Sequence, residues 1–506
     1  MQKNILEYLE NTARNAPDKI AFSGENEKLP FFEIFETSRA IGTFLINKGI
    51  KSSPIVVFMG KRPSTITAFL GVVYSGCYYV PIDEDIPEQR AKLIFDSLGS
   101  FTVIVDKETK NTVENYGINA QVFLFEEIIK TSAVDKCLDN IRQSQIDIDP
   151  VYIVFTSGST GVPKGVVACH RSVIDYIDNL TSALGLNFDT VFGNQAPLYV
   201  DGKLKDIYSV LKLGATAYLI PKKLFMFPLL LAEFLNHNKI NTILWAASAL
   251  KILSSFEILD KNPPVHLRTI AFGSEVFPVK HLNLFKKHIP AARYFNLYGP
   301  TEATGMSCYY EVKRDFNEDE LIPIGKPFNN TEIILLDHNN QEVKNDQKGE
   351  ICIKGISLAL GYYRDFDRSN RVFVQNPLNS FYPETIYRTG DIGRYNKDGD
   401  LVFISRKDNQ IKHMGYRIEL GEIETAVSSL EKIAACACIY DKENDKIVLI
   451  YQGNGMDDKA IIEGIKHKLS KYMHPNKLVR VKLMPHNQNG KIDRVWLKNN
   501  YQTIDK

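Results

Sequence analysis

Short apolar runs alternate with helix-like stretches through the first part of the chain. The runs at 54–59, 101–105 and 151–155 are rich in β-branched and aromatic residues. Nearly continuous apolar runs of this length are typical of strands that are buried on both faces of a parallel sheet. The alternation of such runs with helices predicts an α/β fold.

The stretch 30–49 illustrates the helices expected between these runs. Pro30 suits the start of a helix, and Gly49 suits its end. Between them, apolar residues recur at helical spacing at Ile34, Ile41 and Leu45. We expect this helix to cover one face of a sheet.

Three later strand-like segments lead into loops that carry small or polar residues. They lie at 242–244, 268–272 and 293–297. Ligands of open α/β sheets bind at the carboxyl ends of the strands. The loops that follow these segments are therefore candidates for a binding site.

The length of the chain and the change in its sequence pattern along the chain indicate more than one domain. A chain of 506 residues exceeds one ordinary core. The polar stretch 130–150 is expected to be an exposed connection between two α/β blocks, and the strand-like segments 351–354 and 401–404 are expected in a more antiparallel region. We predict a large domain at 1–405 and a small domain at 406–506.

The composition is balanced. Lys and Arg total 61 against 60 Asp and Glu, so nothing draws the chain generally to nucleic acid or to a membrane surface. No apolar run is long enough to span a bilayer. Seven Cys without metal-type spacing favour a reducing, cytoplasmic location. Cys436 and Cys438 alternate in an apolar stretch, which predicts that they share one face of a strand.

A loop that follows the run 151–155 carries the strongest chemical signal. Its glycines let backbone N–H groups approach phosphate oxygens, its hydroxyl groups add donors, and its lysine adds a movable positive charge. It differs from the P-loop of NTPases, because Gly158 and Gly161 are too close and Lys164 is followed by Gly165. The candidate phosphate-binding residues are Thr156, Ser157, Gly158, Ser159, Thr160, Gly161 and Lys164.

This loop and four further segments, in this order along the chain, resemble the adenylate-forming superfamily of acyl-CoA synthetases, luciferases and nonribosomal peptide synthetase adenylation domains. The further segments lie at 296–302, 387–391, 406–424 and 489–494. The resemblance implies a large N-terminal domain of parallel α/β sheets with a small barrel-like region. A small mobile C-terminal α+β domain would follow.

The resemblance also implies a nucleotide site for ATP and Mg²⁺. Tyr298 would stack on adenine, Asn296 would read its edge, and Thr301 would contact the α-phosphate. Asp391 would accept hydrogen bonds from the ribose with help from Arg406, and Glu302 would hold the Mg²⁺ ion. The remaining residues of this implied site are Gly273, Ser274 and Gly299.

Three positions in the C-terminal part are implied to serve the two half-reactions. Lys491 would be catalytic, because its ammonium would stabilise negative charge that builds up around the α-phosphate. Asp408 would be the hinge of the small domain. Gly415 would line the tunnel for a phosphopantetheine arm, where a side chain would obstruct the arm.

The resemblance to amino-acid-activating members rests on Asp201, which it places in the substrate pocket. A carboxylate in a largely apolar pocket needs a charge partner, and the ammonium of an amino acid would supply it. The resemblance implies a side-chain pocket in which Phe272 would shorten the space and favour a small amino acid. Lys205 would either pair with an acidic side chain or extend towards solvent. The implied pocket residues are Gly202, Lys205, Leu244, Ile270, Phe272, Leu297, Gly305 and Met306.

These features predict a ligase that adenylates a small amino acid and passes it to the phosphopantetheine thiol of a carrier protein on another chain. The D-alanine–carrier ligases are the most similar branch, although that branch has Cys where Gly273 stands here. Two alternatives remain open. One is an acyl- or aryl-CoA ligase, and the other is a catalytically inactive nucleotide-binding homologue.

Overall fold

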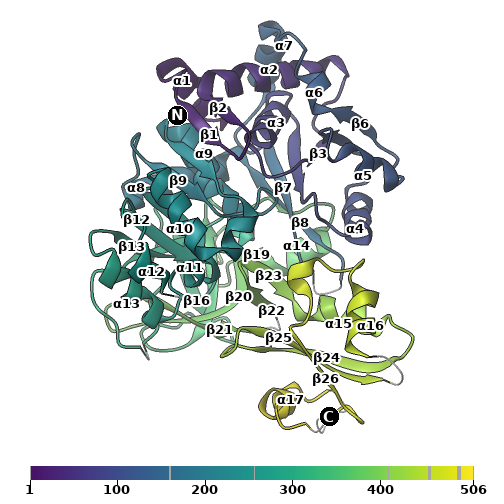
Figure 1. Ribbon diagram of the computed structural model, residues 1–506, viewed down its shortest axis with the longest axis vertical. Helices are drawn as coiled ribbons and strands as arrows, with labels where there is room; N and C mark the ends of the chain where they lie inside the picture. Colours follow the sequence, from purple (N-terminus) through teal and green to yellow (C-terminus); the bar gives the residue numbers. More distant parts are fainter. Residues whose placement is uncertain are drawn as a thin grey trace. The chain divides into compact units, whose positions relative to one another are not determined.

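The computed structural model describes residues 2–158, 161–255, 257–318, 320–407, 410–453, 457–486 and 492–504. The chain divides into two compact units, whose elements are labelled in Figure 1. Unit 1 comprises Met1–Glu84, Leu98–Val154 and Gly165–Lys407, and unit 2 comprises Asp85–Ser97, Phe155–Lys164 and Asp408–Lys506. Because unit 2 takes in two N-terminal segments, the simple division into 1–405 and 406–506 stays a prediction.

The first sheet of unit 1 is mainly parallel. Val56 of β3 (Pro54–Phe58), an interior strand, pairs in register with Val80 on one side and Val103 on the other. Its strands follow the order β18 (Gly361–Tyr362), β8 (Lys164–Cys169), β7 (Pro150–Thr156), β4 (Tyr78–Ile82), β3 (Pro54–Phe58), β5 (Thr102–Val105) and β6 (Gln121–Leu124). Its connecting helices include α2 (Phe31–Asn47), α3 (Pro63–Tyr74), α5 (Lys110–Asn115), α6 (Phe125–Ile128) and α7 (Asp135–Ser144). Helix α2 starts after Pro30 and precedes Gly49 at φ +73°, as predicted.

The second sheet of unit 1 is parallel in its centre and antiparallel at its edges. Its strands follow the order β15 (Lys326–Pro327), β14 (Cys308–Glu311), β13 (Arg293–Tyr298), β12 (Thr269–Gly273), β11 (Thr242–Ala246), β9 (Val191–Asn194), β10 (Thr216–Leu219), β1 (Ile20–Ser23) and β2 (Lys28–Pro30). Its helices include α1 (Leu6–Asn15), α8 (His170–Leu184), α9 (Leu204–Leu213), α10 (Pro228–His237), α11 (Ala247–Leu253), α12 (Ile258–Lys261) and α13 (Val279–His288). Parallel sheets with connecting helices confirm the predicted α/β class.

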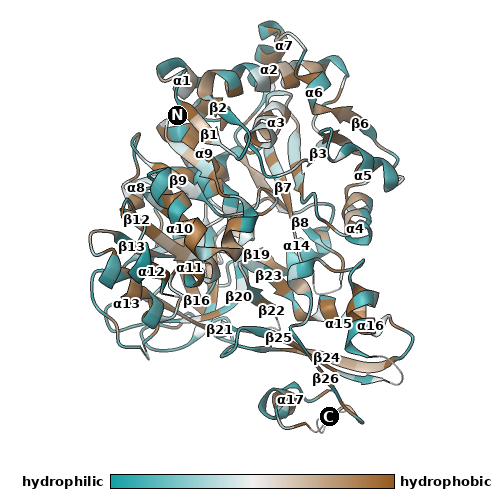
Figure 2. Ribbon diagram, viewed as in Figure 1, coloured by the Kyte–Doolittle hydropathy of each residue, from teal (hydrophilic) through white to brown (hydrophobic). Residues whose placement is uncertain are grey.

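The two faces of the second sheet belong to different hydrophobic cores. On one face, Leu244 and Leu297 join the core that contains α8 and α9. On the other, Ile270 and Phe272 join the core that contains α10 and α13. Side chains alternate along a strand, so adjacent positions supply opposite cores. Figure 2 shows the apolar character of β12 in brown.

The rest of unit 1 is an antiparallel sheet, as the sequence predicts beyond residue 350. Its strands are β16 (Thr331–Leu336), β17 (Gly349–Gly355), β20 (Thr385–Tyr395), β19 (Phe373–Gln375) and β21 (Leu401–Arg406), with α14 (Phe366–Val372) alongside. Asp391 on β20 faces Arg406 on β21 in the register of this sheet.

Unit 2 joins two small sheets to helices. Its elements include α4 (Glu88–Leu98), β22 (Gln410–His413), β23 (Tyr416–Glu419), α15 (Leu420–Ser428), β24 (Ile433–Asp441), β25 (Lys446–Gly453), α16 (Asp458–Ile465), β26 (Lys477–Arg480) and α17 (Arg494–Asn500). Cys436 and Cys438 lie on one face of β24 in a single core, as predicted. All seven cysteines are free thiols.

One fold prediction is wrong. The stretch 130–150 is not simply an exposed connection, because it forms α7, whose Leu138 is buried in the first core. It also does not separate two sheets, since β4 and β7 on either side of it pair in parallel. The prediction failed because most residues of this helix are polar and only Leu138 is buried. In the part of the chain that the structure describes, no helix is both long and apolar enough to cross a membrane.

Candidate active site

Tyr298, Asp391 and Arg406 form a buried polar cluster in unit 1. The Tyr298 hydroxyl donates to Asp391 Oδ2 at 2.6 Å, and Arg406 Nη1 donates to Asp391 Oδ1 at 2.8 Å. Burial, followed by the charge of Asp391, raises the pKa of Tyr298 well above its usual range. The structure therefore brings together three of the residues predicted to bind nucleotide, and it holds both carboxylate oxygens of Asp391 in place.

Asn296 lies two residues before Tyr298 on β13. Its side-chain Nδ2 donates to the carbonyl oxygens of Ile322 at 3.2 Å and Pro323 at 2.9 Å. Both donors of the amide are used in these bonds, so the orientation of the side chain is fixed. The carbonyl end, Oδ1, is the acceptor that such an arrangement leaves for a ligand amino group.

Glu302 lies in a short 3-10 helix, Thr301–Ala303, after the carboxyl end of β13. Its side chain is fully buried and accepts a hydrogen bond from the Tyr362 hydroxyl at 2.7 Å. A buried carboxylate suits Mg²⁺, which is commonly held by one or two protein carboxylates together with water and phosphate oxygens. Among the described residues no cluster of three or more His, Cys, Asp or Glu forms a complete cage. This donor set fits Mg²⁺ held largely by a phosphate ligand.

The loop from Gly299 to Met306 is tightly folded. A Cβ at Gly299 would lie 2.5 Å from Met306 Cα, and a Cβ at Gly305 would lie 2.6 Å from the Tyr176 ring. Gly305 also has φ +96°. Both glycines are needed for close approach of the backbone. The close approach of Gly299 to Met306 brings the two ends of this loop together, with Glu302 between them.

The described part of the phosphate loop lies in unit 2. The Ser157 hydroxyl donates to the Arg417 carbonyl at 2.7 Å, and Gly161 N–H donates to the Gly158 carbonyl at 3.0 Å. The Thr156 hydroxyl is buried and has no hydrogen-bond partner in the described residues. Lys164 begins β8. Ser159 and Thr160 lie outside the described residues.

Asp201 and Lys205 lie at the start of α9, which continues from the 3-10 helix Asp201–Lys203. Asp201 is partly buried. The pKa values of Tyr152 and Tyr176 are raised, first by the burial of each tyrosine and next by the negative charge of Asp201. Lys205 is 5% exposed, and its Nζ lies 3.8 Å from where a Cβ of Gly202 would be. The structure therefore brings Asp201, Gly202 and Lys205 to one place.

The residues predicted to line the side-chain pocket divide between two faces of the second sheet. Leu244, Leu297 and Met306 share a core with α8 and α9. Ile270 and Phe272 point to the opposite face, where the Phe272 ring lies 4.6 Å from the Phe277 ring. The structure does not bring these two side chains to the other pocket residues. The shortening predicted from Phe272 has no support in this geometry.

Gly273 is the last residue of β12, and Ser274 follows it. A Cβ at Gly273 would lie 2.6 Å from the Leu297 carbonyl oxygen, so the spacing of β12 and β13 at this point leaves no room for a side chain. Ser274 adopts φ +65°, which turns the chain away from the strand. These two residues place a sharp turn at the carboxyl edge of the sheet.

Three site residues are predicted in the C-terminal part of the chain, and the structure describes one of them, Gly415. Asp408 and Lys491 lie outside the described residues. Gly415 has φ +81° and follows Met414 at φ +53°, in the two-residue turn between β22 and β23. Such a turn requires positive φ at both positions. The turn gives Gly415 a structural role whether or not it also lines a tunnel.

Lys203, two residues after Asp201, and Lys61 were not among the predicted site residues. Lys203 is fully buried, and its Nζ lies 5.3 to 5.7 Å from the ring centres of Phe69, Tyr79 and Tyr152. Lys61 Nζ donates to the carbonyls of Asn194, Gln195 and Ile220. Burial lowers the pKa of each lysine to about 7. The only sequence signal was a lysine next to a candidate pocket aspartate.

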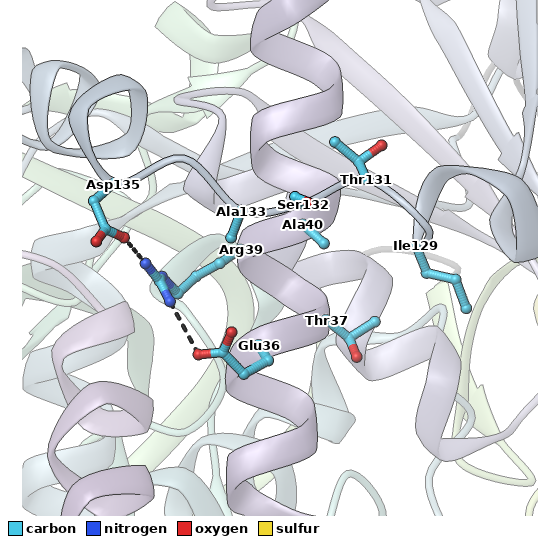
Figure 3. Close-up of a pocket in the computed structure, with 9 residues that line it drawn as sticks. All are labelled: Glu36, Thr37, Arg39, Ala40, Ile129, Thr131, Ser132, Ala133 and Asp135. Atoms are coloured by element: carbon cyan, nitrogen blue, oxygen red, sulfur yellow. Dashed lines mark hydrogen bonds and ion pairs between the residues drawn. The ribbon is translucent and has the colours of Figure 1, made fainter.

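A surface hollow elsewhere in unit 1 contains none of the predicted site residues. It lies beside α2, where Arg39 pairs with Glu36 and with Asp135 (Figure 3). Polar and small side chains line the rest of it, including Thr37, Thr131 and Ser132. The Arg39 guanidinium is already paired with the Glu36 and Asp135 carboxylates, so it is not left for an anionic ligand.

Comparisons with known proteins identify the family. The sequence model described as AMP-binding enzyme matches residues 9–363. The D-alanine--D-alanyl carrier protein ligase of Bacillus licheniformis is 30% identical over 98% of this chain and 99% of its own length. Tyrocidine synthase 3 of Brevibacillus parabrevis is 31% identical over 97% of this chain, which spans only 7% of that relative's length.

A solved structure agrees in fold. PA1221, an NRPS protein containing adenylation and PCP domains, superposes with a TM-score of 0.83 at 24% identity and covers 99% of this chain and 98% of its own. Together these matches confirm the resemblance that the motifs indicated, to enzymes of the adenylation-domain and carrier-protein-ligase type. The chain belongs to the AMP-binding enzyme family.

Proposed function

We propose that this protein uses ATP to adenylate the carboxyl group of an amino acid and then transfers the aminoacyl group to the phosphopantetheine thiol of a separate carrier protein. The observation that carries the amino acid assignment is the Asp201 carboxylate. It lies in the 3-10 helix that leads into α9, a helix that shares a core with Leu244, Leu297 and Met306, and it forms no hydrogen bond or ion pair with a described residue. A substrate ammonium is the partner that such a carboxylate lacks.

The first half-reaction forms a bond between a carboxylate oxygen of the amino acid and the α-phosphorus of ATP, and pyrophosphate leaves. Asp391, fixed by Tyr298 and Arg406, is suited to accept hydrogen bonds from the ribose. Glu302 would hold Mg²⁺, which would supply positive charge beside the phosphates. Lys491 is proposed to add positive charge where the α-phosphate becomes more negative.

In the second half-reaction the thiolate sulfur attacks the carbonyl carbon of the aminoacyl adenylate, and AMP leaves with the electrons of the C–O bond. Lys491 must move away before the thiol arrives, which is the role proposed for a hinge at Asp408. The full-length match to the D-alanyl carrier protein ligase, which is named for a carrier protein, supports a carrier as the acceptor. This match does not identify the amino acid. The D-alanine branch has Cys where Gly273 stands, and here a Cβ at Gly273 would come too close to Leu297.

An acyl- or aryl-CoA ligase is the competing function, since it would use the same nucleotide site. It would leave the Asp201 carboxylate without a charge partner in the pocket. A catalytically inactive homologue is a weaker alternative, because it gives no reason for the ordered contacts of Asp391 and Asn296.

Pyrophosphate exchange into ATP tests the proposal. The purified protein is assayed with a panel of L-, D- and β-amino acids and with simple fatty and aryl acids. We expect at least one amino acid to support exchange well above every acid that lacks an amino group. Exchange with simple acids alone would favour the CoA ligase, and no exchange with any acid would favour the inactive homologue.

A further inference from the structure

Lys205 is a buried lysine whose ammonium has no hydrogen-bond acceptor among the described residues. Its side chain is on the first turn of α9 and the residue is only 5% exposed. Across the described ranges, its ammonium forms no hydrogen bond or ion pair. Burying an ammonium without acceptors is costly, because the group loses its water shell and gains nothing in return. A ligand that supplies the missing acceptor would reduce this cost.

Lys61 and Lys203 differ from Lys205 in this respect. Lys61 donates to three backbone carbonyls. Lys203 donates to the Val200 carbonyl at 3.2 Å and is surrounded by three aromatic rings. Both ammonium groups are therefore satisfied by the protein itself. Of the three, Lys205 is the one that the described structure leaves for a ligand.

Asp201 and Lys205 lie four residues apart in one continuous helical stretch, so they share a face. Opposite charges at this spacing often form an ion pair, but these two do not pair within the described structure. Gly202 between them has no side chain, and its position faces Lys205 Nζ. A carboxylate and an ammonium thus stand on one helical stretch, each without a hydrogen bond or ion pair to a described residue.

The carboxylate with the largest electrostatic influence on Lys205 is Asp206. Its Oδ2 accepts from Asn194 Nδ2 at 2.6 Å, whereas its Oδ1 has no hydrogen-bond partner among the described residues. Asp206 and Asp201 both oppose the fall in the pKa of Lys205 that burial causes. They help to keep Lys205 charged, but neither provides a hydrogen bond to it.

We infer that the amino acid activated by this enzyme carries a second carboxylate in its side chain, and that this carboxylate binds Lys205 while the α-ammonium binds Asp201. The inference rests on the proposed amino acid adenylation and names the class of substrate. It replaces the small neutral amino acid expected from Phe272, whose ring lies on the other face of the sheet.

Pyrophosphate exchange with matched pairs of amino acids tests this inference. Aspartate and glutamate, as L and D isomers, are compared with asparagine and glutamine, which have the same shape without the charge. Alanine, glycine and serine represent the small neutral class. We expect kcat/KM for one acidic amino acid to exceed that for its amide by roughly 100-fold, as for other buried charge pairs.

Variants then locate the effect. Lys205→Met keeps the length of the side chain and removes the charge. It should lower kcat/KM for the acidic substrate by roughly 100-fold, mainly through KM, and leave the amide unchanged or improved. Lys212→Met is the control, because Lys212 is on the same helix but already pairs with Asp178 at 2.6 Å. It should behave like the parent protein.

The outcomes separate the two claims. Preferred exchange with alanine, glycine or serine would overturn the inference about Lys205 and leave the proposed function standing. So would a Lys205→Met variant that keeps the preference for the acid, or one that loses activity equally with every amino acid. Exchange with no amino acid would instead overturn the proposed function itself.

Discussion

Tyr298 and Asp391, 93 residues apart in the sequence, are joined by a 2.6 Å hydrogen bond from the tyrosine hydroxyl to Oδ2 of the aspartate. Arg406 occupies the other oxygen of the same carboxylate. The bond ties the carboxyl end of the parallel β13 to β20 of the antiparallel sheet, both within unit 1. Two residues that the sequence predicts in one nucleotide site are therefore direct partners.

Asp391→Asn should weaken ATP binding. The substitution keeps the shape of the side chain but removes the charge that strengthens hydrogen bonds to ribose hydroxyls, a loss of about 1.5–3 kcal/mol. We expect KM for ATP in pyrophosphate exchange to rise by roughly 10- to 100-fold. Tyr298→Phe keeps the charge of Asp391 and removes a hydrogen bond that orients it, so its effect should be smaller. An unchanged KM for ATP in Asp391→Asn would exclude Asp391 from the nucleotide site.

The burial of His170 should make the free energy of unfolding depend on pH. Its Nδ1 accepts the Ile5 N–H at 3.2 Å, and burial lowers its pKa from 6.5 to about 3. The unfolded chain binds a proton near pH 6.5 and the folded chain does not, so the stabilisation is present above pH 6.5 and is lost as pH falls. Between pH 7.5 and 5.0 this site should remove about 2 kcal/mol of unfolding free energy.

Urea unfolding of the parent protein and of His170→Gln at the two pH values measures this contribution. The variant should be less stable than the parent protein at pH 7.5, because the Ile5 N–H loses its imidazole acceptor, but should lose less stability on acidification. An equal pH dependence for the two proteins would show that His170 does not titrate differently in the folded state.

Gly273→Ala tests the close approach of β12 and β13. The added Cβ would lie 2.6 Å from the Leu297 carbonyl oxygen, so the strands must separate. Overpacking of this kind costs about 1–3 kcal/mol. We expect a lower midpoint of thermal unfolding and weaker exchange activity, and the same for Gly273→Cys. Gly193→Ala on β9 is a milder comparison, because its Cβ would lie no closer than 3.1 Å to the nearest side chain. Full stability of Gly273→Cys would show that the D-alanine branch residue fits here.

Periodicity and motif order predicted much of the fold and part of the site. The runs that became β3, β5 and β7 were apolar on both faces, and parallel strands with such faces have few alternatives. Asp391 and Tyr298 were found because each stands in a motif of its own. Helix α7 was missed because only Leu138 of its ten residues is buried, so its polar character dominated the pattern.

The pocket could not be predicted to the same degree. Ile270 and Phe272 were transferred to it by motif alignment, but alternation on β12 turns both towards the core with α10 and α13. The burial of Lys205 could not be predicted from the sequence either. Whether a lysine near a helix start reaches solvent or is buried depends on tertiary packing against distant segments.

Lys491→Ala separates the two half-reactions. Removing the ammonium should lower the rate of aminoacyl adenylate formation by roughly 10²- to 10³-fold, as for the loss of other groups that stabilise transition-state charge. Thioester formation from supplied aminoacyl adenylate should stay close to that of the parent protein. Lys482→Ala is the control, because Lys482 is exposed in the same part of the chain. Equal losses in both half-reactions would contradict the role proposed for Lys491.

The most direct test of amino acid adenylation compares the best amino acid with its analogue that lacks only the amino group, for example glutamate with glutarate. Pyrophosphate exchange is measured for both acids with the parent protein and with Asp201→Asn. The account predicts that the parent protein prefers the amino acid by roughly 100-fold and that Asp201→Asn loses most of this preference. Equal use of the two acids by the parent protein, or an undiminished preference in Asp201→Asn, would contradict it.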